Sequence, residues 1–403
     1  MIDARLQLPC GAVLPNRLAK AALSEQLGDG RHAPSEQLIR LYQRWSRSGA
    51  GLLITGNVMV DPAAIGEPAN VVVEGRRDLD QLRRWARAGK AGGATVIAQV
   101  NHPGRQVPVS LDRRPVGPSA VPMKGMLGVF ATPRALSVEQ IHEIQDRFAR
   151  TARVLIAAGF DGVQLHGAHG YLISQFLSPL ANQRTDEYGG DPVNRRRFLL
   201  ELVEKTREAI GPDRILSVKL NSADFQRGGF DEDESIEVAR QLAAGGIDLL
   251  EISGGTYEQA AMMGVVRRES SRRREAYFLD FAEKLRAQVD VPLMVTGGFR
   301  TRAGMDAALS SGAVDVVGLG RPMAVQPEAP RLLLNGSIGS LDVITEKRLG
   351  HPKLDGMAET VWYTTQLWRM GRGKDPAVRR PAAVGVGHYL LGGVGHTVRK
   401  KVS

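Results

Sequence analysis

Short apolar runs alternate with longer amphipathic stretches along most of this chain. Eight of the runs are rich in Val, Ile and Leu and have the length of a β-strand. They are Arg17–Leu23, Gly51–Thr55, Ala94–Val100, Gly162–His166, Ile215–Leu220, Asp248–Ile252, Pro292–Thr296 and Val314–Gly318. Continuous apolar runs of this kind are typical of strands that are covered on both faces, as in a parallel sheet.

Helical patterns fill the intervals between these runs, and several of them open on Ser, Thr or Asp at the position of an N-cap. The predicted helices are Ser35–Ser48, Leu79–Ala88, Ser137–Ala158, Arg195–Ile210, Asp233–Ala244, Tyr277–Gln288 and Arg302–Ser310. Eight strand–helix alternations favour a closed (β/α)8 barrel, the TIM-barrel fold of the α/β class, over an open doubly wound sheet. We predict that the barrel occupies residues 1–335.

Two segments exceed the minimal barrel. Asn101–Leu136 contains six prolines and is far longer than an ordinary strand-to-helix connection. Long loops in compact domains are often lids or binding loops, so we expect this one to cover the catalytic mouth. Residues 336–403 form a C-terminal extension with a helix over Ala358–Met370 and a basic, Gly-rich end. We expect this helix to pack on the barrel or on a neighbouring subunit of a homo-oligomer.

Composition narrows the chemistry. Cys10 is the only cysteine among 403 residues, which excludes an internal disulfide and leaves too few thiolates for an iron–sulfur centre or a Cys-rich zinc site. The chain starts without the apolar run of a signal peptide, and no stretch reaches the ~18 apolar residues of a membrane span, so we expect a cytoplasmic protein. The net charge of +10 favours anionic partners, but much of the excess lies in residues 371–403. We therefore expect a small-molecule substrate and no nucleic acid.

Polar side chains stand at the carboxyl ends of the predicted strands, where barrel enzymes build their active sites. The third strand ends near Gln99, the fourth leads into His166, His169 and Tyr171, and the fifth ends near Lys219. In a closed barrel these ends meet around one mouth. The pattern therefore predicts one site that combines an amide, two imidazoles, a phenol and an ammonium group.

Glycines follow the seventh and eighth strands. Gly297, Gly298 and Gly320 leave backbone N–H groups open, and Arg321 adds a positive charge. In barrels this region often binds a phosphate group. Alternatively, the glycines only make tight turns.

The segment 159–198 is similar to the hallmark segment of the old yellow enzyme family of flavin oxidoreductases. It reads GFDGVQLHGAHGYLISQFLSPLANQRTDEYGGDPVNRRRF. Supporting matches are PNRLAKAALSE near the start, GAGLLITGNVMV at strand two, AQVNHPGRQ at strand three and VDVVGLGRPMA at strand eight. The resemblance spans residues 15–330 and implies a (β/α)8 barrel that binds FMN. It also implies hydride transfer from NADH or NADPH, through the flavin, to an activated C=C bond.

The resemblance implies that FMN lies across the barrel mouth. The residues that it assigns to the cofactor are Ala21, Ala22, Ser24, Asn57, Gln99, Lys219, Gly297, Gly298, Gly320 and Arg321. A lysine that points into a barrel mouth needs an anion, and a reduced flavin develops negative charge at N1 and O2. Alternatively, Lys219 forms a structural ion pair with a carboxylate such as Glu251.

His166 and His169 match the family pair that holds the substrate oxygen, and two donors would stabilise the enolate-like charge that forms as hydride arrives. A histidine pair could instead bind a metal, although no third ligand at metal spacing is apparent, so we predict no metal. Tyr171 matches the usual proton donor of the family. Without that match, a lone tyrosine in a barrel would be assigned to packing.

Several positions depart from the family pattern. The usual Pro-Met after the first strand is Ala22-Leu23, Ser24 stands where some members have a redox-tuning cysteine, and Gln164 replaces a common glutamate. These departures leave other functions open. One is oxidative C–N or C–O cleavage, as in the amine dehydrogenase and demethylase branches, and another is a non-enzymatic flavin-binding regulatory protein.

An arginine-rich run follows the sixth strand. It comprises Arg267, Arg268, Arg272, Arg273 and Arg274. This run could recognise the phosphate of NADPH, or it could be a solvated loop.

Overall fold

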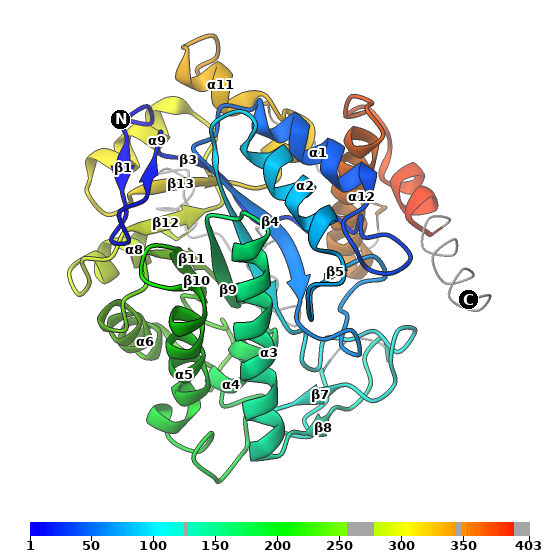
Figure 1. Ribbon diagram of the computed structural model, residues 1–403, viewed down its shortest axis with the longest axis vertical. Helices are drawn as coiled ribbons and strands as arrows, with labels where there is room; N and C mark the ends of the chain where they lie inside the picture. The colour runs from blue at the N-terminus through cyan, green and yellow to red at the C-terminus, as the bar shows by residue number, and fades with distance from the viewer. Residues whose placement is uncertain (125–127, 256–277, 343–348, 351, 391–403) are drawn as a thin grey trace.

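A closed barrel of eight parallel strands forms the centre of the molecule, and helices surround it (Figure 1). The computed structural model describes residues 1–124, 128–255, 278–342, 349–350 and 352–390. The barrel strands are β3 (Leu18–Lys20), β4 (Leu52–Met59), β6 (Thr95–Asn101), β9 (Gly162–Gly167), β10 (Ile215–Asn221), β11 (Leu249–Ser253), β12 (Leu293–Thr296) and β13 (Val316–Leu319). Neighbours pair in that order, and β13 pairs with β3 to close the barrel. The predicted (β/α)8 fold is confirmed, and each predicted strand overlaps one barrel strand.

The outer helices follow the strands in chain order. They are α1 (Glu36–Ser46), α2 (Leu79–Lys90), α3 (Val138–Ala157), α4 (Leu172–Leu177), α5 (Pro192–Ile210), α6 (Glu232–Ala244), α8 (Leu279–Arg286), α9 (Arg302–Ser310), α10 (Pro322–Val325), α11 (Ala329–Leu334) and α12 (Pro352–Gly371). Side-chain caps fix several of their starts, since Ser35, Asp191 and Asp231 each accept a backbone N–H three residues later. Ser137 and Gln140 form a reciprocal capping box at α3.

Short strands lie outside the barrel wall. They are β1 (Leu6–Gln7), β2 (Val13–Leu14), β5 (Val71–Val72), β7 (Val116–Gly117) and β8 (Arg134–Ala135). The β1–β2 hairpin places Leu8 and Leu14 against an apolar cluster inside the barrel. The other members of this cluster come largely from the barrel strands and include Ala19, Leu52, Ile97, Ile215, Leu249, Met294 and Val316. The hairpin therefore covers the amino end of a barrel whose lower half is filled by aliphatic side chains.

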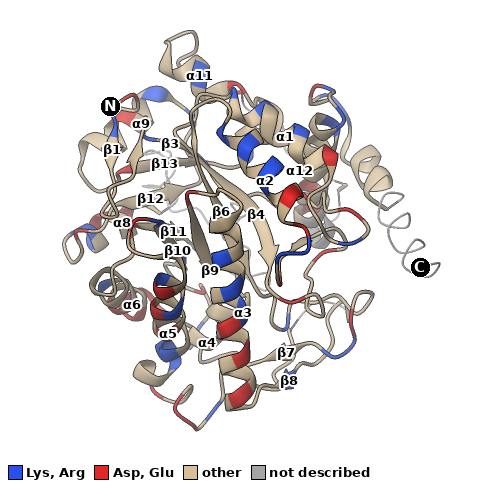
Figure 2. Cartoon of the chain, in the orientation of Figure 1, with Lys and Arg blue, Asp and Glu red and all other residues tan. Residues whose placement is uncertain are grey.

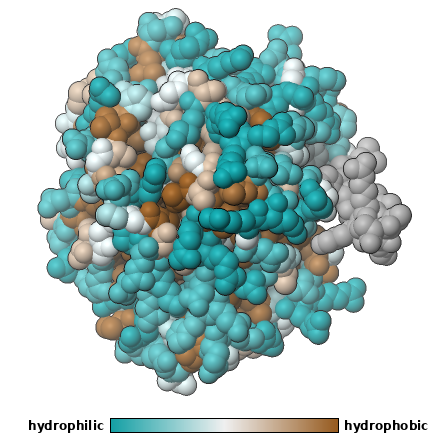
Figure 3. Space-filling view, in the orientation of Figure 1, coloured by the Kyte–Doolittle hydropathy of each residue, from teal (hydrophilic) through white to brown (hydrophobic). Residues whose placement is uncertain are grey.

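Charge is concentrated on the outer layer. Figure 2 shows Lys, Arg, Asp and Glu along helices α1, α3 and α5, whereas strands β4 and β9 carry none of these residues. The same face is mainly hydrophilic in Figure 3, with apolar residues in small separate groups. Among the described helices, none combines the length and the apolar character that a membrane crossing needs.

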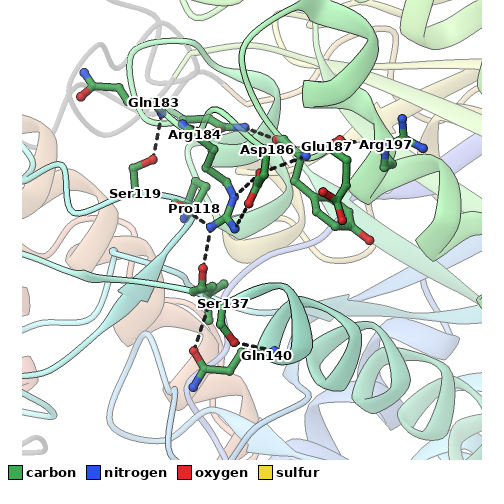
Figure 4. A network of polar contacts seen from close by, with 12 residues as sticks. Pro118, Ser119, Ser137, Gln140, Gln183, Arg184, Asp186, Glu187 and Arg197 are labelled. Carbon is green, nitrogen blue, oxygen red and sulfur yellow. Dashed lines mark hydrogen bonds and ion pairs between the residues drawn. The ribbon is translucent and has the colours of Figure 1, made fainter.

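The start of the long segment 101–136 contacts helix α4, since Gln175 Nε2 donates to the carbonyl oxygen of Pro103 at 3.1 Å. Further along, the segment is hydrogen-bonded to the turn that follows α4 (Figure 4). Arg184 Nη1 donates to the carbonyl oxygen of Pro118 at 2.9 Å, and the N–H of Gln183 donates to Ser119 Oγ at 2.8 Å. These contacts attach the backbone of Pro118 and the side chain of Ser119 to the turn that follows α4.

Candidate active site

A cavity of about 290 Å³ opens at the carboxyl ends of the barrel strands. All eight strands, or the loops that follow them, contribute to its wall. Helix α12 supplies a further part of the wall, with Glu359, Thr360, Tyr363, Thr364 and Leu367. In contrast, none of the described residues of segment 101–136 lines the cavity. The prediction that the long loop covers the catalytic mouth is therefore wrong for its described residues. Helix α12 of the C-terminal extension covers this part of the cavity instead.

Helix α12 is attached to the first part of the barrel. Trp368 Nε1 donates to the carbonyl oxygen of Glu25 at 3.0 Å, and Arg40 Nη1 donates to that of Gly371 at 3.0 Å. Trp362 is fully buried, and its indole donates to the carbonyl oxygen of Arg380. The expectation that this helix packs on the barrel is met, and the packing makes the C-terminal extension part of the site.

The floor of the cavity includes Ala22, Leu23 and Ser24, which follow β3. Beneath them, the carboxylate of Glu25 accepts hydrogen bonds from Tyr42 Oη at 2.6 Å and from the N–H of Gly56 at 3.0 Å. A Cβ at position 56 would collide with the backbone carbonyl oxygen of Leu23 as well as with Glu25 Oε2, so only glycine allows this approach.

A fully buried lysine completes this support. Lys20 Nζ donates to the carbonyl oxygen of Ile54 at 2.6 Å and lies 3.5 Å from Glu25 Oε1. Burial lowers the pKa of Lys20 to about 8, and the charge of Glu25 opposes this shift. The loop that carries the floor is therefore fixed from below by buried charged and hydrogen-bonded groups.

A chain of polar side chains runs across the interior below the mouth. Gln99 Nε2 donates to Gln164 Oε1 at 2.8 Å, and Gln164 Nε2 donates to Glu251 Oε2 at 2.9 Å. Lys219 Nζ lies 2.9 Å from Glu251 Oε1. Gln99 and Lys219 line the cavity, whereas Gln164 and Glu251 are fully buried. Lys219 thus makes the ion pair that the sequence left open as an alternative, and it also faces the cavity.

His166 and His169 lie together on the cavity wall with ring centroids 5.0 Å apart. Burial, and then the positive charge of Lys219, hold the pKa of both imidazoles well below 6.5. Both rings are therefore neutral at pH 7. The N–H of Ala168 donates to His166 Nδ1 at 3.4 Å, which leaves the proton of this ring on Nε2.

His169 has a backbone conformation that residues other than glycine rarely adopt. Its φ is 61°, in the left-handed region, and it is followed by Gly170. Asn221 Oδ1 accepts from its N–H at 3.2 Å, Gln106 Nε2 donates to its carbonyl oxygen at 2.9 Å, and its Nε2 lies 2.7 Å from Ser253 Oγ. These contacts aim the second imidazole into the cavity. Among the described residues, no group of three metal-binding side chains includes this pair.

Tyr171 stands next to the two imidazoles. Its ring centroid lies 4.8 Å from that of His166, and it also lines the cavity. The residue is the N-cap of α4, so the helix begins directly after it. The structure thus brings together all three residues that the sequence assigned to catalysis.

The opposite end of the cavity has open backbone and a positive charge. Gly297 and Gly298 have φ values of 110° and 96°, and both line the cavity together with Gly320 and Arg321. Arg321 Nη1 lies 3.6 Å from Glu359 Oε2 of α12. This combination of glycine N–H groups and a guanidinium can hold a phosphate group.

The donor set fits FMN. Of the residues that the sequence assigned to the cofactor, all line the cavity except Ala21, which is buried and donates its N–H to the carbonyl oxygen of Leu319. Asn57 Oδ1 is a buried acceptor without a hydrogen-bond partner, and Asn57 also lines the cavity. A buried polar atom of this kind needs a partner, and the N–H groups of a flavin ring could supply one.

Comparison with known proteins agrees with this geometry. The model of the NADH:flavin oxidoreductase / NADH oxidase family matches residues 11–336. The chain belongs to this family. An NADH-dependent flavin oxidoreductase of Aspergillus parasiticus, nadA, is 39% identical over 340 residues, which are 80% of this chain and 76% of that protein.

Solved structures give the same result for the fold. An old yellow enzyme homologue from Zymomonas mobilis has a TM-score of 0.72 at 27% identity, and the match covers 85% of this chain and 95% of that one. A 2-naphthoyl-CoA reductase shares the fold with a TM-score of 0.81 at 24% identity, over 93% of this chain and 58% of that one. As a member of the NADH:flavin oxidoreductase family, the protein is an oxidoreductase of the old yellow enzyme type that uses FMN and a reduced nicotinamide nucleotide.

Sequence reasoning missed some parts of the site. Ser253 ends strand β11 and could have been found by the rule that strand ends carry the site. The residues of α12 carried no such signal, because their helix lies outside the barrel repeat. The arginine-rich run at 267–274 falls outside the described residues, and its suggested role stays a prediction.

Proposed function

We propose that the protein reduces activated C=C bonds, those of α,β-unsaturated carbonyl compounds or nitroalkenes, with electrons from NADH or NADPH. The observation that carries the proposal is the placement of two neutral imidazoles and a phenol on one cavity wall, with Lys219 on the adjacent strand. Bound FMN supplies hydride exchange between the nicotinamide and the substrate.

The imidazoles would hold the carbonyl or nitro oxygen of the substrate. Negative charge develops on this oxygen as the β-carbon accepts hydride, and preoriented N–H donors in a buried site stabilise such charge strongly. A neutral imidazole can donate one hydrogen bond without carrying charge into the cavity. The tautomer of His166 favours this role, because its Nδ1 is already used as an acceptor.

Tyr171 would protonate the carbon next to the carbonyl group. Its ring stands beside His166, so a substrate held by the imidazoles presents its adjacent carbon to the phenol. In the same arrangement Gln99 and Lys219 would contact the pyrimidine side of FMN, and Gly297, Gly298, Gly320 and Arg321 would surround its phosphate. These assignments are supported by the shared cavity that all of these residues line.

An anaerobic binding and turnover experiment tests the proposal. We expect purified protein to release FMN on denaturation and to bind a phenol with a charge-transfer band. His166→Ala and His169→Ala should weaken phenol binding and slow enone reduction by about 10² to 10³, the usual value of one such donor. His142→Ala is the matched control, since His142 lies in α3 with Tyr188 as its partner and does not line the cavity.

Three results would contradict the proposal. Protein that binds no flavin after reconstitution would remove its basis, and unchanged phenol affinity in both histidine variants would make the pair structural. Oxidation of amines or ethers without enone reduction would instead favour C–N or C–O cleavage.

We also propose that the protein is a cytoplasmic homo-oligomer. The location is supported by the sequence, in which no stretch reaches the ~18 apolar residues of a membrane span. Helix α12 packs on its own barrel, so the oligomeric state rests on the expectation from the sequence alone. Analytical ultracentrifugation of the full chain at micromolar concentration measures the oligomeric state, and a single monomeric species would contradict this part.

A further inference from the structure

Glu251 is a buried acid with a complete set of partners. Its Oε1 lies 2.9 Å from Lys219 Nζ and accepts from Thr296 Oγ1 at 2.7 Å, and its Oε2 accepts from Gln164 Nε2 at 2.9 Å. None of its side chain is exposed, whereas Lys219 and Thr296 line the cavity. The carboxylate therefore sits directly behind the cavity wall and contacts two of its members.

A structural role alone gives a poor account of this ion pair. Replacing a buried ion pair by apolar residues of similar volume is often neutral or stabilising, because desolvation offsets the attraction between the charges. The same strand carries aliphatic residues one layer lower, where Leu249 packs in the apolar cluster. Aliphatic side chains could therefore fill this layer as well. The presence of the charged pair Lys219 and Glu251 instead indicates that it has a function at the mouth of the barrel.

The positive charge of Lys219 acts on other residues of the site. Register places Lys219 of β10 opposite His166 of β9 on one side and Glu251 of β11 on the other. Its positive charge contributes to the low pKa of both His166 and His169. A carboxylate at 2.9 Å must offset much of this field, since charges interact strongly across a buried site.

We propose that Glu251 is a positioning residue that holds Lys219 at the cavity wall and reduces the positive charge that this lysine presents to the flavin. The inference rests on the proposed placement of FMN over Lys219. Reduced flavin is more negative than oxidised flavin, so a positive neighbour favours reduction and a carboxylate behind that neighbour opposes it. Glu251 thereby keeps the reduction potential of bound FMN lower than Lys219 alone would set it.

The amide of Gln164, which is hydrogen-bonded to Glu251, makes it possible to move the negative charge to a neighbouring position without removing it. Gln164 lies on the opposite side of Lys219 from Glu251 in the sheet order, yet the two side chains are hydrogen-bonded to each other. Glutamate and glutamine have nearly the same shape. In the double variant Gln164→Glu with Glu251→Gln, the same pair of side chains keeps one carboxylate and one amide with their positions exchanged.

Anaerobic dye-equilibration measurements of the midpoint potential test the inference, together with FMN dissociation constants from fluorescence quenching. Lys219→Met should shift the potential to more negative values and weaken FMN binding about tenfold, through loss of a charge-assisted contact. Glu251→Gln should shift the potential to more positive values. The exchanged double variant should return the potential towards that of the wild type.

The signs of the shifts in midpoint potential in Lys219→Met and Glu251→Gln distinguish an electrostatic role of the ion pair from a structural one. A purely structural ion pair would give shifts of the same sign, or none, when either partner is removed. The matched control is Asp248→Asn, because Asp248 precedes the same strand, is almost fully buried and pairs with Arg207 at 2.7 Å away from the cavity. This control should lower the melting temperature and leave the potential unchanged.

Each remaining outcome decides between the two proposals. If Lys219→Met changes neither the potential nor the FMN affinity, the flavin does not lie over Lys219, and the proposed cofactor placement fails. If Lys219→Met changes them and Glu251→Gln leaves the potential unchanged or makes it more negative, only the role of Glu251 is overturned. If Glu251→Gln does not fold, the exchanged variant decides alone, and its failure to bind FMN would contradict the inference.

Discussion

The two halves of the barrel interior are built by the same strands and have opposite character. The amino half is aliphatic and holds Ile97, Leu249 and Met294 in one fully buried cluster. The carboxyl half begins two residues further along each of these strands, with Gln99, Glu251 and Thr296. Because side chains of a strand alternate between its faces, residues two apart point into the same interior. A single step of two residues therefore separates the part that stabilises the fold from the part that performs chemistry.

This contrast explains how a reactive site can be built on a rigid frame. Buried polar groups are costly unless they are paired, so the carboxyl half needs the hydrogen-bonded chain that joins Gln99, Gln164 and Glu251. The aliphatic half needs no such order and supplies packing energy. Substitutions in the two halves should therefore affect different measurements.

The largest expected effect is kinetic and lies in the polar half. Tyr171→Phe keeps the ring and removes one oxygen, so flavin reduction by the nicotinamide should be nearly unchanged. Reoxidation by an enone should slow by about 10² to 10⁴, the usual contribution of a general acid. Rapid-mixing absorbance measurements separate the two half-reactions.

A nitroalkene serves as the control substrate for this variant. Its reduction product, a nitronate, is stable enough to leave the site before protonation, so reoxidation should slow less and nitronate should accumulate. Equal slowing of both half-reactions would mean that Tyr171 shapes the site and that another group provides the proton.

The second prediction concerns stability and lies in the aliphatic half. Ile97→Ala creates a cavity among fully buried side chains, which should lower the free energy of unfolding by about 2–5 kcal/mol. Urea unfolding followed by circular dichroism measures this change. FMN affinity at low temperature should stay within about twofold of the wild type, because the residue lies one layer below the cavity. A large loss of FMN affinity in the folded variant would show that the two halves are coupled.

The barrel and the catalytic wall could be predicted because both follow from local patterns. The eight apolar runs mark the strands, and parallel strands necessarily bring their carboxyl ends to one mouth. For this reason His166, His169 and Tyr171 share a wall with Lys219, although His166 and Lys219 lie 53 positions apart in the sequence. The resemblance at residues 159–198 then gave these residues roles that their spacing alone could not give.

The rest of the site depends on contacts between distant segments, which a one-dimensional pattern does not record. Helix α12 reaches the cavity because Trp368 and Arg40 attach it to the first part of the chain. Similarly, Gln164 removes the negative charge that the family pattern places on β9, yet Glu251 on the strand after next supplies a carboxylate to the same group of side chains. Predicting this arrangement requires the register of three strands, which their apolar character leaves undetermined.

The smallest expected effect lies at the boundary between the halves. Gln99→Leu continues the aliphatic character of Ile97 by one layer and leaves Gln164 Oε1 without its donor at 2.8 Å. The loss of one hydrogen bond should lower the free energy of unfolding by about 1 kcal/mol, and FMN affinity should fall by a similar amount, roughly three- to tenfold. Because Gln99 is assigned to the ring end of the cofactor, riboflavin should lose affinity by the same factor as FMN. Arg321→Gln, at the phosphate end, provides the opposite case and should weaken FMN while leaving riboflavin unchanged. Fluorescence titrations of both variants with both flavins measure the four dissociation constants. If Gln99→Leu weakens the binding of FMN and leaves the binding of riboflavin unchanged, Gln99 does not contact the flavin ring. The boundary between the aliphatic and the polar half of the barrel then lies on the carboxyl side of Gln99.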